Sequence, residues 1–134
     1  MSRKRENVRQ CKAIRQLIDD NKYTKALELI DAIPLEEVGS LDDLYRYAEL
    51  YEKAERMDKK KEIFYHIYHR THSRYMLNRL LRLTIRMGDM EEARELYFAY
   101  EVAGPITLDT FELRYLLAKA EGAVSYTHLT LPTT

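Results

Sequence analysis

The feature that most constrains the fold is a repeat in which equivalent apolar positions recur at separations of 34 and then 33 residues. Tyr23, Met57 and Met90 stand in matching places just after a polar turn. Four further sets keep the same separations: Ile30, Phe64 and Tyr97; Ile33, Ile67 and Tyr100; Leu17, Tyr51 and Thr84; and Ile14, Ala48 and Leu81. Self-similarity at this period is the signature of stacked helical hairpins, in which each repeat packs against its neighbours.

Each repeat is predicted to hold two amphipathic helices joined by a polar turn. The middle repeat shows this most clearly, because apolar side chains in residues 44–67 keep a helical period on both sides of a turn at 56–58. Helices are also predicted over about 8–19, 24–33, 75–87, 89–103 and 107–121. Ser40, Ser73 and Asp89 are predicted N-caps, and Gly88 is a predicted left-handed C-cap.

Composition fits one soluble helical domain. The chain has 134 residues, with 4 Gly and 3 Pro, too few for a sheet with many tight turns. Lys and Arg together number 22, as do Asp and Glu, so net charge does not favour nucleic acid. The single cysteine, Cys11, excludes an internal disulfide and is expected in a helix core. No apolar segment is long enough to span a bilayer, and we expect a cytoplasmic protein.

Residues of a given size recur in a fixed order within the repeats. In the second repeat the order is carried by Leu44, Tyr47, Ala48, Tyr51, Phe64 and Ile67, and in the third by Leu77, Leu80, Gly88, Ala93, Tyr97 and Pro105. Over about 7–121 the chain therefore resembles the tetratricopeptide repeat (TPR) family of helical hairpins. Three residues depart from the family pattern: Gln10 in a large-aromatic position, Lys60 where alanine is usual, and Leu81 where a small residue is usual.

We predict an all-α fold, a right-handed α-solenoid of about three helical hairpins plus one unpaired C-terminal helix. The predicted parts are a basic N-terminal extension over 1–6, a TPR-like repeat domain over 7–121, and a tail over 122–134. The repeat units are about 7–40, 41–73, 74–106 and a partial unit, 107–121.

The tail differs from the rest of the chain. Residues 124–134, VSYTHLTLPTT, carry no charge, whereas 33% of all residues are charged, and the helical period ends at Gly122. The string resembles the translated read-through of a transposase sequencing adaptor. That resemblance implies a non-native tail, a gene that continues past Ala123, and a last helix without its packing partner. The alternative is a short disordered or strand-like tail. No function is expected of Tyr126 and His128.

The sequence shows no motif for catalysis, a cofactor or a metal. It lacks a Gly-rich phosphate loop and a nucleophile elbow. His66, His69 and His72 are spaced for two imidazoles on one helix face, but residues 63–88 contain no Cys, Asp or Glu to complete a zinc site. We interpret these as surface histidines and predict that the protein is not an enzyme.

Basic residues gather in one stretch, because residues 63–88 contain no acid but include Arg70, Arg74, Arg79, Arg82 and Arg86. In stacked repeats the first helix of each hairpin lines the concave face, so equivalent positions form ladders. One ladder holds Lys12, Arg46 and Arg79, and another holds Arg15, Glu49 and Arg82. The predicted peptide-binding residues are Lys12, Arg15, Tyr45, Arg46, Asn78, Arg79, Arg82 and Arg86. Alternatively, these arginines are a solvated surface or pair with acids of a neighbouring repeat, such as Glu49 or Glu91.

The expected function is a non-enzymatic protein-interaction module or scaffold that binds a peptide or partner helix on its concave face. Guanidinium groups bind carboxylates in a bidentate way, so the expected partner is acidic or presents a C-terminal carboxylate. Several TPR proteins clamp a peptide terminus in this manner, and the resemblance extends that expectation here. Two alternatives remain, an RNA-binding helical repeat and a regulatory or scaffold domain of a longer protein.

Overall fold

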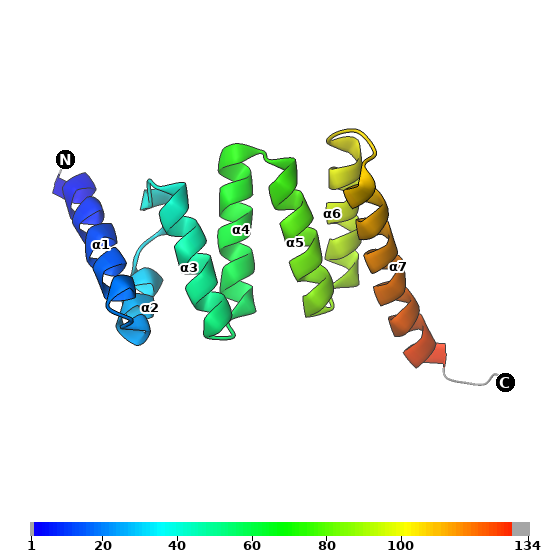
Figure 1. The fold of residues 1–134 in the computed structure, drawn as a ribbon, viewed down its shortest axis with the longest axis horizontal. Helices are drawn as coiled ribbons and strands as arrows, with labels where there is room; N and C mark the ends of the chain where they lie inside the picture. Colours follow the sequence, from blue (N-terminus) through cyan, green and yellow to red (C-terminus); the bar gives the residue numbers. More distant parts are fainter. Residues whose placement is uncertain (1, 130–134) are drawn as a thin grey trace. The chain divides into compact units, whose positions relative to one another are not determined.

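The computed structural model describes the backbone of residues 2–129 and the side chains of residues 5–122. Over this range the chain forms seven α-helices, one 3-10 turn and no strand, which confirms the all-α prediction (Figure 1). The helices fall into two compact units, Met1–Thr71 and His72–Thr134. Among the described residues no helix is both long and apolar enough to cross a membrane.

The first unit contains two helical hairpins. Helices α1 (Ser2–Asp19) and α2 (Tyr23–Ala32) form the first, and α3 (Leu41–Lys53) and α4 (Met57–Thr71) form the second. A 3-10 turn, η1 (Leu35–Glu37), joins them and packs on α4, while α2 packs on α3. The core includes one predicted repeat position from each hairpin, Ile14 on α1 and Ala48 on α3, both buried.

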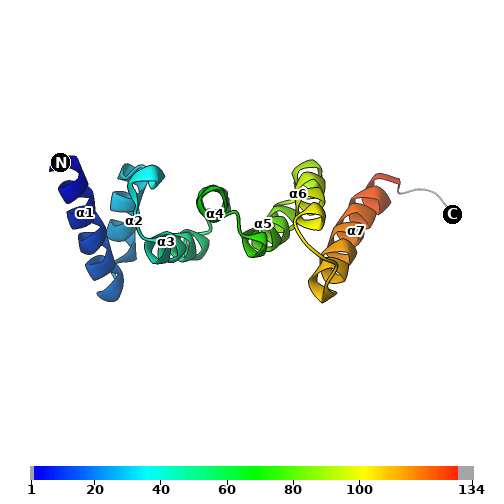
Figure 2. The ribbon, with the colours of Figure 1, turned by 90° about the horizontal axis from the view of Figure 1, so that it is seen from above.

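The second unit contains three helices that all contact one another: α5 (Arg74–Met87), α6 (Met90–Val102) and α7 (Leu108–Leu129). Seen from above, they lie side by side (Figure 2). Leu77, Leu80 and Thr84 of α5 are buried, and so are Thr110, Leu113 and Leu117 of α7. Because the second set follows the first at a constant separation of 33 residues, α7 repeats the core-facing pattern of α5.

The backbone repeats at the same period as the side chains. Asn21, Glu55 and Gly88 all adopt positive φ, at 60°, 60° and 84°. In each turn the following amide donates to a carbonyl five residues back: Lys22 to Leu17, Arg56 to Tyr51, and Asp89 to Thr84, at 2.8, 2.8 and 3.3 Å. These are Schellman turns, which close a helix through one left-handed residue. The turns between α1 and α2, between α3 and α4, and between α5 and α6 therefore share one geometry.

The shared turn predicts opposite effects for two substitutions. We expect Glu55→Gly to raise the free energy of unfolding by about 0.5–1 kcal/mol, because glycine adopts positive φ without the steric cost of a Cβ. Gly88→Ala should lower it by about 1 kcal/mol. A Cβ at Gly88 would meet no atom within 4 Å, so this loss comes from the backbone alone. Urea unfolding followed by circular dichroism measures both.

The neighbouring Ala54 supplies the control for this test. Its φ is −85°, so Ala54→Gly should destabilise the chain by adding freedom to the unfolded state. A Glu55→Gly variant that loses as much stability as Ala54→Gly would contradict the shared turn geometry.

Two of the predicted N-caps form their side-chain hydrogen bond in the structure. The Oγ of Ser40 accepts the Asp43 amide at 3.4 Å, and Oδ1 of Asp89 accepts the Glu92 amide at 3.2 Å. Ser73 is the N-cap residue of α5, and Gly88 closes α5 in the left-handed conformation. Side-chain caps therefore define the starts of α3 and α6, whereas Ser73 begins α5 without a side-chain cap hydrogen bond.

Several helix limits differ from prediction. Helix α1 begins at Ser2 because Arg, Lys and Glu are good helix formers even where no apolar period marks them. The 3-10 turn was not predicted, and the middle turn lies at 54–56. Helix α7 continues to Leu129, beyond the end of the apolar period at Gly122. The described part of the tail is thus helical and not strand-like, and residues 130–134 lie outside the described residues.

Lys60 shows how a lysine replaces the usual alanine of the pattern. The residue is buried, yet its Nζ forms an ion pair with Glu52 and lies 5.3 Å from the ring centroid of Phe64. A lysine can bury its aliphatic stem while the amine reaches the edge of a packed surface. Lys60 is therefore accommodated between α3 and α4.

Candidate functional site

The sequence-predicted binding residues divide between the two units. Lys12 and Arg15 lie on α1, and Tyr45 and Arg46 lie on α3. The other four lie on α5: Asn78, Arg79, Arg82 and Arg86. Several of these side chains contact the chain itself, so each unit is described in turn.

In the first unit, Arg15 is engaged by a buried acid. Its Nε lies 3.1 Å from Oδ1 of Asp43, whose side chain is only 4% exposed. The pair joins the first helices of two successive hairpins. Arg15 is therefore a structural contact, as the pairing alternative allowed, although its partner is Asp43 instead of Glu49 or Glu91.

In the second unit, Arg82 bridges two helices. Its Nε donates to Oδ1 of Asn78 at 2.6 Å, and its Nη1 lies 2.9 Å from Oε1 of Glu112 on α7. Asn78 is buried. Arg82 belongs to the same ladder as Arg15, and both reach an acid early in the next first helix. This ladder thus holds successive repeats together in both units.

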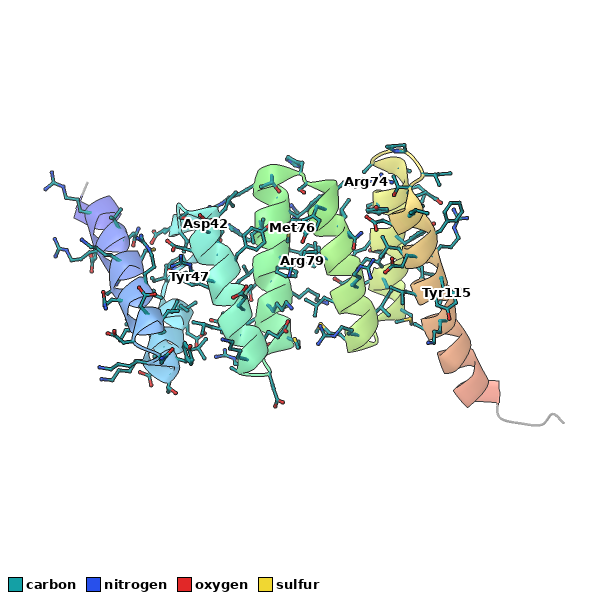
Figure 3. The ribbon with its side chains drawn as sticks, viewed as in Figure 1. Asp42, Tyr47, Arg74, Met76, Arg79 and Tyr115 are labelled. Atoms are coloured by element: carbon teal, nitrogen blue, oxygen red, sulfur yellow. The ribbon has the colours of Figure 1, made fainter. Side chains whose placement is uncertain are left out.

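The remaining predicted residues are more accessible. Lys12, Arg46 and Arg86 are exposed and form no ion pair with the described part of the chain. Arg79, labelled in Figure 3, is partly exposed. Its guanidinium carbon lies 5.8 Å from the ring centroid of Tyr75 on the same helix. Tyr45 is half-buried. These cations remain candidates for contacting a ligand.

The predicted surface histidines have different environments. His69 and His72 are exposed, but His66 is half-buried, and its Nε2 has no hydrogen-bond partner among the described residues. Burial, together with the charge of Arg70, lowers the pKa of His66. Within the described residues no group of three or more His, Cys, Asp or Glu side chains is placed to hold a metal ion.

A cavity of about 340 Å³ opens in the first unit and was not predicted. Its lining includes the apolar residues Ile30, Ile33, Leu35 and Ile63 together with several charged residues. At its rim Lys59 lies 3.6 Å from Glu62. Asp31, also at the rim, accepts hydrogen bonds from the Tyr51 hydroxyl and from Nη1 of Arg56, the latter at 3.0 Å. These rim charges are largely satisfied within the chain.

The Asp31 contacts predict acid sensitivity. Burial opposes ionisation, but the hydrogen bonds from Tyr51 and Arg56 outweigh it and lower the pKa of Asp31. The resulting stability is present above the unfolded-state pKa of about 3.9 and is lost as pH falls through the lower folded-state value. Because Asp31 is 40% exposed, we expect less than about 1 kcal/mol. Urea unfolding should show a smaller decrease below pH 4 for Asp31→Asn than for the native chain.

Helix α7 carries an apolar stripe on each of two opposite faces. The buried stripe is Thr110, Leu113 and Leu117. The exposed one, which we call the α7 stripe, consists of Leu108, Phe111, Tyr115, Ala118 and Gly122. Leu108, Phe111 and Tyr115 are 87%, 56% and 63% exposed. Figure 3 shows Tyr115 on the side of α7 away from α5. A helix that is apolar on both faces normally packs between two layers.

The α7 stripe has heptad spacing, with alternating steps of three and four residues from Leu108 to Gly122. Such a/d spacing is the pattern by which one helix receives another. The flanking e and g positions carry the charges Glu112, Arg114, Lys119 and Glu121. They therefore form a rim with two acids and two cations.

The rim side chains reach away from the stripe to both neighbouring helices. Glu112 pairs with Arg82 of α5, as described above. On the other side, Arg114 lies 3.1 Å from Glu101 of α6 and donates to the Tyr97 hydroxyl at 2.9 Å. Glu121 pairs with Arg94 of α6. Because α5 and α6 lie at the two edges, the α7 stripe faces away from both.

Helix α6 adds exposed apolar surface beside α7. Phe98 and Val102 are 65% and 67% exposed. In the sequence, Phe98 follows Tyr97 and Val102 follows Glu101. Both Tyr97 and Glu101 contact Arg114 of α7. The helical period of the sequence did not separate the exposed Phe111 and Tyr115 from the buried residues of the last helix. The sequence signal that could have separated exposed from buried residues is the presence of a second apolar stripe on the other side of the helix.

Comparison of the chain with protein-family models, with curated proteins and with solved structures finds no match. The TPR resemblance therefore stays a prediction from the repeat pattern of the sequence. The candidate site is argued from the chain's own residues.

Proposed function

We propose that the protein is a non-enzymatic interaction module that receives a partner α-helix on the α7 stripe. The observation that carries the proposal is the exposed heptad pattern on the face of α7 opposite its buried stripe. Large exposed apolar residues that are scattered singly need no explanation, but a contiguous apolar strip marks an interaction surface. The fold supports this role, because α5 and α6 hold α7 from behind.

The partner expected at this surface is an amphipathic helix with its own a/d stripe. Phe111 and Tyr115 supply the large anchors, and aromatic residues dominate the binding energy of many interfaces. Because the rim holds equal numbers of acids and cations, it does not select an acidic partner. A preference for an acidic peptide would instead come from the exposed cations of α5.

The expectation that cations of α5 bind an acidic peptide is tested with a variant of that helix. Arg82 bridges Asn78 and Glu112, so Arg82→Ala should reduce stability as well as any binding. Arg86→Ala is the cleaner variant, because Arg86 is exposed. We expect it to leave thermal stability nearly unchanged while weakening capture of an acidic peptide, as measured by fluorescence anisotropy.

A designed peptide tests the proposed helix-binding function. The peptide carries leucine at every a and d position with mixed charges at e and g, and its binding is followed by fluorescence anisotropy. We expect Tyr115→Glu to weaken binding at least about tenfold, because a buried charge would replace an aromatic anchor. A peptide with serine at the a and d positions should not bind.

Tyr75→Glu is the matched control. Tyr75 is 61% exposed on α5, close to the 63% of Tyr115 on α7. Both rings also have a cation one turn ahead: Arg79 lies 5.8 Å from the Tyr75 ring centroid and Lys119 lies 6.0 Å from that of Tyr115. Equal loss of binding in the two variants would refute the assignment to α7.

A further inference from the structure

The sizes and charges of the residues in the α7 stripe and its rim indicate which helix binds there. We propose that a second copy of this chain lays its α7 antiparallel along the α7 stripe, forming a two-fold symmetric dimer. This inference rests on the proposed function, since it requires that the stripe receives a helix. Two-fold pairing uses the same surface on both copies, so every contact described below occurs twice.

The sizes of the stripe residues fit an antiparallel pair. In such a pair each a position lies opposite a d position of the other helix. When Tyr115 faces Ala118 of the second copy, Phe111 faces Gly122 of that copy. Both layers then place a large aromatic residue against a small one. Alternating large and small residues across an interface allows the side chains to interdigitate.

The rim charges fit the same register. In an antiparallel pair, e positions meet e positions and g positions meet g positions. Glu112 then lies opposite Lys119 of the second copy, and Arg114 lies opposite Glu121. All the facing pairs are oppositely charged, which favours this alignment.

The alternative alignments bring like charges together. Shifting the antiparallel pair by one heptad places Glu112 against Glu112 and Arg114 against Arg114. In a parallel pair the g residue Arg114 lies beside the e residue Lys119 of the other chain. Repulsion in the unwanted arrangements is a recognised source of pairing specificity. The charge pattern therefore selects one antiparallel register.

Ion pairs within the chain hold two of the rim side chains beside the α7 stripe, where this pairing requires them. The side chains of Glu112 and Arg114 are 55% and 51% exposed while bound to Arg82 and Glu101. Each is thus held at the edge of the stripe and keeps exposed polar atoms for a second partner. Lys119 is exposed, and its amine lies only near the Tyr115 ring among the described residues. The shared charges mainly set the register, and the aromatic layers supply most of the affinity.

Sedimentation equilibrium of the full chain tests the dimer. Because a two-helix interface is small, we expect a dissociation constant in the micromolar range. Tyr115→Glu should be monomeric, and Tyr75→Glu should remain dimeric. Lys119→Glu should raise the dissociation constant about tenfold, because glutamate would then face Glu112 twice. Arg86→Glu, on exposed α5 surface, should leave it unchanged.

Cysteine pairing tests the register. Mixing Tyr115→Cys with Ala118→Cys should produce a cross-linked dimer on mild oxidation, whereas mixing Phe111→Cys with Tyr115→Cys should not. Cys11 is buried and does not compete. The reverse cross-linking pattern, or a dimer that survives Tyr115→Glu, would overturn the inference.

A monomer at every accessible concentration would also overturn the inference while leaving the proposed function open to its own test. The designed peptide would then still bind the native chain and fail to bind Tyr115→Glu. Loss of both dimer and peptide binding would reject the two together.

Discussion

Replacing Arg74 with alanine is expected to lower the free energy of unfolding by about 3 kcal/mol. This side chain, on α5, closes the loop between α6 and α7. Its Nε donates to the Tyr100 carbonyl at 3.0 Å, and its Nη1 donates to the Pro105 carbonyl at 2.8 Å. Its guanidinium carbon lies 4.0 Å from the ring centroid of Tyr100. Alanine would remove all three contacts. Urea unfolding followed by circular dichroism measures the loss.

Two variants make this prediction specific. Arg86→Ala removes an exposed arginine from the same helix and should change stability by less than about 0.5 kcal/mol. Gly104→Ala probes the same site from the loop, since its Cβ would lie 2.8 Å from Nη1 of Arg74. If the guanidinium occupies that place, Gly104→Ala should be destabilising in the native chain and nearly harmless in Arg74→Ala. Equal costs in both backgrounds would contradict the arrangement.

The sequence period predicted the hairpin cores well. Tyr47, Phe64 and Ile67 were assigned from spacing alone and are fully or almost fully buried. Spacing succeeds here because a hairpin buries one face of each helix, so burial follows the helical period. Cap positions were also predictable, because a side-chain oxygen satisfying a free amide is a local interaction.

The roles of the arginines could not be predicted in the same way. Arg15, Arg74 and Arg82 looked alike as exposed cations, yet each binds a group far along the chain. Such partners are brought together only by helix packing, which a ladder of equivalent positions does not specify. Two members of the predicted ladder, Arg15 and Arg82, form ion pairs within the chain, while its role in ligand binding stays a prediction.

The exposed stripe of α7 was not predicted from the sequence, for a different reason. Its apolar residues lie on two faces, and a search for one amphipathic face assigns all of them to the core. Only the packing of α5 and α6 shows which stripe is covered. Leu113 is buried and Leu108 is 87% exposed, although both are leucines on one helix. Residue type alone therefore could not locate the candidate site.

Removing Arg15 is expected to destabilise the chain by about 2 kcal/mol, because the Asp43 carboxylate would stay buried without its cation. The side chain of Arg15 is 44% exposed, so the cost should fall below the 3–5 kcal/mol typical of fully buried pairs. Lys12→Ala, one turn earlier on α1 and exposed, should have an effect below about 0.5 kcal/mol. Urea unfolding of both variants separates a structural arginine from a surface one.

The double variant Arg15→Ala with Asp43→Asn distinguishes the ion pair from simple loss of packing. A neutral amide at position 43 removes the buried charge, so the double variant should recover about 1 kcal/mol relative to Arg15→Ala alone. No recovery would mean that Arg15 stabilises α1 and α3 through its aliphatic stem. Recovery would confirm that the Arg15 ladder position joins successive repeats and is occupied before any ligand arrives. The exposed Lys12 and Arg46 would then be the cations of the first unit that remain accessible to a partner.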